Sequence, residues 1–106
     1  MNLPDKKFKI GDVVHFELNI TSIDYSFLVE GHTLVYNDGD NKEYGNIKEI
    51  DENDLHKLNN IISPHRWTMN LRHLNSGKKF KSCIEIDFLL DVEKTRNRKI
   101  NELLNI

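Results

Sequence analysis

The chain has 106 residues, a length at which a single domain with a modest hydrophobic core is expected. Charged residues make up 30% of the sequence, yet the formal net charge is only -2 and the apolar residues fall into patterned runs. This excludes the composition of a disordered chain, which combines few apolar residues with a high net charge. The first ten residues lack the apolar run of a signal peptide, and no apolar run reaches the ~18 residues that span a bilayer. We therefore expect one domain, 1–106, without a membrane partner.

Cys83 is the single cysteine, so no disulfide can form within the chain, and a reducing compartment suits it. Asn, Ile and Lys are abundant, whereas Ala and Gln are absent. That bias is typical of AT-rich coding sequences, such as those of low-GC bacteria and their phages. We expect a cytoplasmic protein of a bacterium or of an infected host cell.

The first half of the chain predicts β structure. Residues 12–20 alternate between apolar and polar side chains, as in a half-buried strand. Residues 23–36 predict a hairpin with Glu30-Gly31 as its two-residue turn, which would place Val29 opposite His32 on one face. Residues 37–46 are rich in Gly, Asn and Asp and predict a polar loop.

A short helix is predicted over about 52–62. Asp51 or Asn53 can cap it, and its apolar residues recur at helical spacing before Ser63-Pro64 ends it. A second helix is predicted over about 91–105, with Asp91 as its cap. It has a thin apolar stripe, made of Val92, Arg96, Ile100, Leu103 and Leu104.

Residues 66–88 carry the clearest pattern, a hairpin with Ser76-Gly77 as a two-residue turn. In that register Trp67, Met69 and Leu71 face the core, while Cys83 lies on the opposite face with the basic side chains. Together these elements predict an α+β, mainly β fold: a small antiparallel sheet or partly open barrel of about five strands, with the two helices added. The β core would cover about 8–36 and 66–90.

The charges are unevenly distributed. Segment 38–54 has seven acids against two lysines, whereas segment 65–81 has five basic residues and no acid. Acidic and basic segments either neutralise one another on the folded surface or form a bipolar surface that steers a charged partner. A further basic cluster lies near the end of the chain. The candidate partner-binding residues are Arg66, Arg72, Lys78, Lys79, Lys81, Lys94, Arg96, Arg98 and Lys99.

The sequence offers little for catalysis or metal binding. The five histidines and Cys83 show none of the close pairings that zinc sites use. Asp38-Gly39-Asp40-Asn41 lacks the later acidic ligand that an EF-hand requires. No phosphate-binding glycine loop and no nucleophile elbow is present. We expect a protein that is not an enzyme and that has no cofactor, no metal and no catalytic residue.

The order of these segments resembles that of small Src-homology-three-like β-barrel domains, including the Tudor and KOW types, of bacterial or phage proteins. Lys9, Gly11, Asp12 and Val14 match the opening motif of such domains. The closing hairpin is matched by Trp67, Gly77, Lys78, Phe80, Glu85, Asp87 and Leu89. The segment 38–62 and the last helix depart from that pattern, and no ligand-binding residue can be carried over. The resemblance implies a binding module, which is an argument by fold analogy.

The leading functional hypothesis is a protein-interaction module, such as a phage accessory protein that binds and inhibits or redirects a host protein complex. The alternative is a nucleic-acid-binding domain that uses the basic 66–81 hairpin and the last helix, since cations and aromatic rings are what single strands require. A small ligand or nucleotide and a homodimer also remain open.

Overall fold

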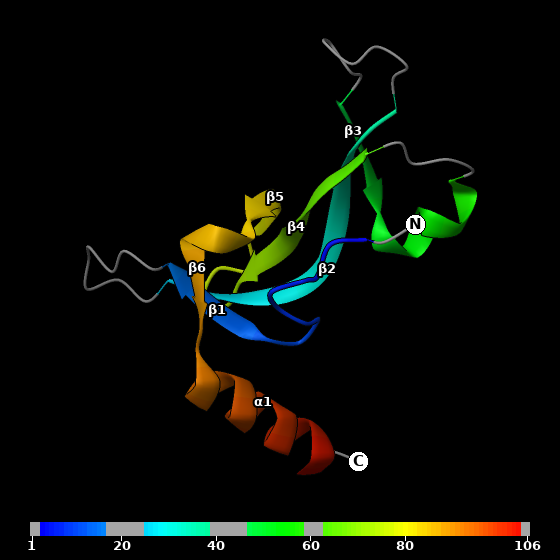
Figure 1. The fold of residues 1–106 in the computed structure, drawn as a ribbon. Helices are drawn as coiled ribbons and strands as arrows, with labels where there is room; N and C mark the ends of the chain where they lie inside the picture. The colour runs from blue at the N-terminus through cyan, green and yellow to red at the C-terminus, as the bar shows by residue number, and fades with distance from the viewer. Residues whose placement is uncertain (1–2, 17–24, 39–46, 59–62, 105–106) are drawn as a thin grey trace.

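The computed structural model describes residues 3–16, 25–38, 47–58 and 63–104. Its six strands are β1 Val13–Phe16, β2 Ser26–Asn37, β3 Ile47–Asp51, β4 Ser63–His73, β5 Lys79–Ile84 and β6 Phe88–Leu90. Its helices are two short 3-10 segments, η1 Glu52–Lys57 and η2 Glu85–Asp87, and the α-helix α1 Val92–Leu104. Figure 1 shows these elements as an open, mostly antiparallel sheet with α1 projecting from one end. The predicted fold class is confirmed.

β2 is the central strand, and its two edges are used differently. The strand order is β5-β4-β2-β1-β6, with β3 paired to β2 off this path. One edge of β2 pairs with β4 from Phe27 to Asn37. The other edge is shared, because residues 26–28 pair with β1 and residues 33–37 pair with β3. β1 and β3 therefore follow one another along the same side of β2.

The turn predicted at Glu30-Gly31 is wrong, because β2 runs unbroken through both residues. A hairpin turn there would need positive φ angles, yet neither residue has one. The pairing with β4 instead shifts between Val29 and Gly31, which leaves Glu30 as the extra residue of a β-bulge. Val29 and His32 thus do not face each other across a hairpin. A glycine inside an apolar strand marks a bulge as readily as a turn.

This correction predicts that two glycines will respond differently to alanine. Gly31→Ala should change the free energy of unfolding by less than about 0.5 kcal/mol, because the new Cβ meets only the Asn70 Nδ2 atom, at 3.4 Å. Gly77→Ala should cost about 1–2 kcal/mol, because Gly77 has φ +73°. Denaturant unfolding of both variants measures the difference. Equal losses of unfolding free energy would contradict the bulge and favour a turn at residues 30–31.

The second hairpin is confirmed, but its predicted register is wrong. His73 N donates to Lys78 O and Gly77 N donates to His73 O, both at 2.8 Å, so the loop has four residues rather than two. Met69 pairs with Cys83 instead of Ile84, and a bulge beside Ser82, whose φ is +58°, shifts the register again. Cys83 therefore packs against the core cluster, on the face opposite to the predicted one.

Three further predictions concern the ends of elements. The strand predicted over 12–20 is confirmed in its described part, as β1, and residues 17–20 lie outside the described residues. The predicted 52–62 helix is wrong in type: its described part is the 3-10 helix η1, and Asp51 makes no side-chain cap. Of the predicted loop, 39–46 lies outside the described residues, and Asn37 belongs to β2. The sequence pattern did not reveal β3, and it did not separate β6, which lies within the predicted β core 66–90, from β5.

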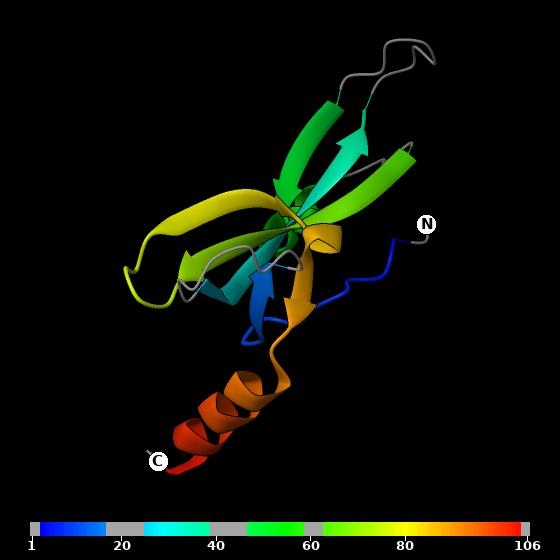
Figure 2. The same ribbon diagram turned by 90° about the vertical axis from the view of Figure 1, so that its left-hand side faces the viewer.

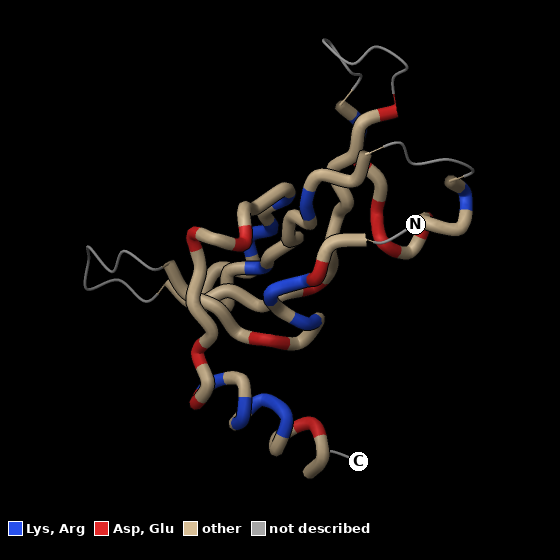
Figure 3. The backbone as a smooth tube through the Cα atoms, in the orientation of Figure 1, with Lys and Arg blue, Asp and Glu red and all other residues tan. Residues whose placement is uncertain are grey.

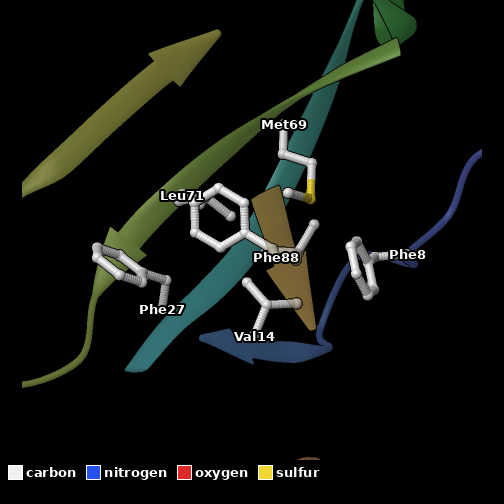
Figure 4. Close-up of a cluster of buried hydrophobic side chains, with 7 residues drawn as sticks. Phe8, Val14, Phe27, Met69, Leu71 and Phe88 are labelled. Carbon is white, nitrogen blue, oxygen red and sulfur yellow. The ribbon is translucent and has the colours of Figure 1, made fainter. Parts of the chain in front are cut away.

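The core lies on one face of the sheet, beneath an N-terminal segment without helix or strand. Figure 4 shows aromatic and aliphatic side chains from four strands converging there. Phe8 of the N-terminal segment closes the cluster and is 4% exposed. The cluster consists of Phe8, Val14, Phe27, Val29, Met69, Leu71 and Phe88. Trp67, Met69 and Leu71 face inward as predicted, because alternate residues of β4 lie on that face.

The predicted C-terminal helix is confirmed as α1, and Asp91 caps it as predicted. The Asp91 Oδ1 atom accepts from Lys94 N at 3.0 Å. The helix is attached to β1 through Thr95, whose Oγ1 accepts from Val13 N at 2.9 Å and donates to Val13 O at 3.3 Å. Asp91 N also donates to Val13 O, at 2.8 Å. One backbone position of β1 thus holds the first turn of the helix.

Candidate interaction surface

The apolar stripe of α1 faces away from the sheet. Thr95 is the buried residue within the helix, whereas Ile100, Leu103 and Leu104 are 46%, 69% and 76% exposed. At 3.6 residues per turn, Ile100 and Leu104 lie about 140° and 180° around the helix from Thr95, and Leu103 lies about 80° from it. Figures 1 and 2 show the helix extending beyond the sheet. The stripe therefore has no cover among the described residues of this chain.

The four cations of α1 divide into two groups. Lys94 donates to Ser26 Oγ at 2.6 Å, and Lys99 lies 3.9 Å from the Asp12 carboxylate, so both hold the helix against the sheet. Arg98 is partly buried, and its Nε has no hydrogen-bond partner among the described residues. Arg96 is exposed on the apolar side of the helix. Arg96 is thus the α1 cation best placed to meet a partner.

The five cations of the predicted hairpin surface do not form one patch. Arg72 and Lys79 are cross-strand neighbours on the face away from the core, and Arg72 Nε lies 3.7 Å from a Glu30 oxygen. The Lys78 ammonium lies 5.4 Å from the centre of the Phe80 ring. The remaining two cations, Lys81 and Arg66, line two separate hollows in the surface.

Lys81 lines a polar groove of about 320 Å³ together with Glu49, Asp51 and Asp54. In this groove Lys81 of the basic segment 65–81 lies near acids of segment 38–54, as expected if the two segments neutralise one another. Arg66 is exposed and lines a separate hollow with Glu85. The basic residues of the hairpin are therefore spread over both faces and the edge of the sheet.

The hairpin and the helix meet at one point. Ser26 O accepts from Leu74 N at 3.0 Å, and Ser26 Oγ accepts from Lys94 at 2.6 Å. The first turn of α1 therefore lies beside the start of the β4–β5 loop, and Figure 2 shows the loop and the helix extending toward the same side. Figure 3 shows basic residues on both elements.

An aromatic surface that was not predicted lies at one end of the sheet. Phe16, Tyr25 and Phe80 are 40%, 39% and 38% exposed. The Phe16 and Tyr25 rings are 6.1 Å apart, and Phe27 joins them to Phe80, at 5.6 Å from Phe16 and 5.8 Å from Phe80. The only sequence sign of this surface is that Phe80 follows Lys78 and Lys79. Trp67, by contrast, is 3% exposed and does not belong to this surface.

Cys83 does not have the surroundings of a nucleophile. Burial raises the pKa of its thiol, whereas a reactive cysteine needs a lowered pKa. Within the described segments, no group of three or more His, Cys, Asp or Glu side chains is arranged to hold a metal ion.

Two wider properties complete the description of this chain. None of the helices in the described ranges has the length and the apolar character that crossing a membrane requires. Comparison of the chain with protein-family models, with curated proteins and with solved structures gives no match.

Proposed function

We propose that this protein is a protein-interaction module and that α1 is its contact element. The observation that carries the proposal is the exposed stripe of Ile100, Leu103 and Leu104, on a helix that the rest of the chain holds through the buried Thr95. Large apolar side chains gathered on one side of a helix are the feature with which helices bind into apolar grooves of partner proteins.

The charges of α1 indicate the rim of such a groove. Arg96 lies on the exposed apolar side, and Lys99 is 60% exposed despite its contact with Asp12. A groove with an apolar floor and an acidic rim complements this side of the helix. Small size and AT-rich composition suit a phage accessory protein that inhibits or redirects a host complex in the bacterial cytoplasm.

A matched pair of substitutions tests the role of α1. Leu103→Asp should weaken capture of a partner from a bacterial lysate at least about tenfold, because burying one leucine is worth about 1.5–3 kcal/mol. Asn101→Asp adds the same charge near the same end of the helix, at an exposed position off the stripe, and should leave capture unchanged. Quantitative pull-down with equal amounts of each folded variant measures the difference. Equal capture of the partner by both variants would show that the apolar stripe of α1 is not part of the interface.

A second candidate function is single-stranded nucleic-acid binding. It is favoured by Phe80, which is 38% exposed and has the Lys78 ammonium over its ring. Exposed rings beside cations stack with bases and neutralise phosphates. In the same pull-down, nucleic acid would then copurify, fall steeply with salt, and be lost in the Lys78→Ala, Phe80→Leu double variant. Copurification without salt dependence would contradict this function.

A further inference from the structure

A pocket of about 520 Å³ lies between the N-terminal segment and the sheet, on the core face and away from α1. The N-terminal strap, residues 3–10, forms one wall and contains neither helix nor strand. Trp67 of β4, His32 of β2 and two residues of η1 form the other walls. Most lining side chains are apolar: Leu3, Pro4, Phe8, Ile10, Leu55 and Trp67. This combination of size and lining is typical of sites for small organic ligands.

One group of polar contacts holds the strap over this pocket. Lys6 forms an ion pair with Glu52, and its ammonium lies 4.7 Å from the centre of the Trp67 ring. Trp67 Nε1 donates to Pro4 O at 2.7 Å. Burial opposes ionisation of Glu52, but the hydrogen bonds from Lys6 and His32 outweigh it and hold the pKa of that carboxyl below its usual value. The strap is therefore held by side chains and not by strand pairing.

His32 has an unsatisfied ring nitrogen in the wall of this pocket. Its side chain is 1% exposed, and its Nδ1 lies 3.3 Å from Glu52 Oε1. An ionised carboxylate only accepts, so the hydrogen resides on Nδ1, and in the neutral ring Nε2 is an acceptor. Nε2 has no hydrogen-bond partner among the described residues. A buried acceptor without a donor is costly, and a donor brought by a ligand removes that cost.

We propose that this pocket binds a small aromatic molecule that carries a hydroxyl or N–H donor. The aromatic body packs against Trp67 and Phe8, and the donor bonds to His32 Nε2. Because Trp67, Phe8 and His32 Nε2 are all shielded from solvent, binding requires the strap to shift, and no strand pairing has to break for that movement. The site is separate from α1, so it does not depend on the proposed protein interface.

Three probes of similar shape test the donor requirement: phenol donates, anisole only accepts, and toluene does neither. The indole N–H signal of Trp67, the single tryptophan, reports binding by NMR titration. Phenol should bind about tenfold more tightly than toluene and anisole, the difference expected for satisfying one buried acceptor. Equal affinities, a preference for anisole, or no shift with any probe would overturn the proposal.

Two variants locate the effect. His32→Phe keeps an aromatic ring but removes the acceptor, so the preference for phenol over toluene should disappear while toluene still binds. Leu55→Trp places a larger side chain at a partly exposed wall position, where folding is not at risk. It should abolish binding of all three probes, read from the Trp67 indole signal after the signal of the added tryptophan has been assigned. Undiminished phenol binding to Leu55→Trp would exclude this pocket, even if His32→Phe fails to fold.

Discussion

Leu71→Ala is expected to lower the free energy of unfolding by about 2–5 kcal/mol. Leu71 is 1% exposed and belongs to the core cluster, where Phe80 of β5 and Val29 of β2 pair with it from either side. Truncation removes buried contacts and leaves a cavity that a sheet held on both edges cannot easily close. Small domains are stable by about 5–15 kcal/mol in total, so urea or thermal unfolding will show this loss clearly.

Leu103→Ala is the matched control for this prediction. It makes the same chemical change at a residue that is 69% exposed on α1. A loss within about 0.5 kcal/mol is expected, because no buried contact is removed and alanine favours helix. A loss comparable to that of Leu71→Ala would show that the end of α1 is covered in solution, by a part of this chain or by a second copy.

Thr95→Val is expected to cost about 1–3 kcal/mol and to release α1 from the sheet. Valine has the shape of threonine but no hydroxyl, so the Val13 N–H, which donates to Thr95 Oγ1 at 2.9 Å, loses its acceptor. Thr95 is 6% exposed, so water cannot readily replace the hydroxyl. Denaturant unfolding gives the loss in free energy, and limited proteolysis after Lys99 reports release of the helix.

Thr95→Ser separates the hydroxyl from the methyl group. Serine keeps both hydrogen bonds to Val13, so this variant should retain most of the stability and the resistance to proteolysis. If serine loses stability while valine keeps it, the methyl group holds the helix and the hydroxyl does not. The comparison also matters for function, because a released α1 would present its apolar stripe without a fixed orientation.

The parts of the fold that the sequence predicts are those determined by local chemistry. Alternation placed Trp67, Met69 and Leu71 on the core face, and Asp91 indicated the start of α1. The errors arise where local chemistry permits two outcomes. Glu30-Gly31 fits a turn or a bulge, and pairing with β4 along the whole strand favours the bulge. The bulge at Ser82 changes which face Cys83 occupies, and nothing near Ser82 in the sequence indicates it.

The candidate sites depend on contacts over long distances in the chain. Lys6, His32 and Glu52 meet only because the strap crosses the core face and η1 follows β3, and no spacing among them signals a site. The basic residues were found from composition, which reports charge but not position. Composition therefore could not show that Lys78 covers Phe80 while Arg72 faces Glu30 on the other side of the sheet. The resemblance to Src-homology-three-like domains stays a prediction.

The shared edge of β2 has a consequence for communication across the molecule. β1, β6 and α1 are attached to one half of β2, whereas β3 and η1 are attached to the other, with the bulge at Glu30 between them. Among the described residues, β2, β4, β5 and the strap run from one half to the other. We therefore expect local opening of one half to leave most hydrogen bonds of the other intact, as in proteins whose cooperative units open separately. Occupancy of the pocket beside His32 and capture of a partner by α1 should accordingly be almost independent thermodynamically, with a coupling free energy near zero.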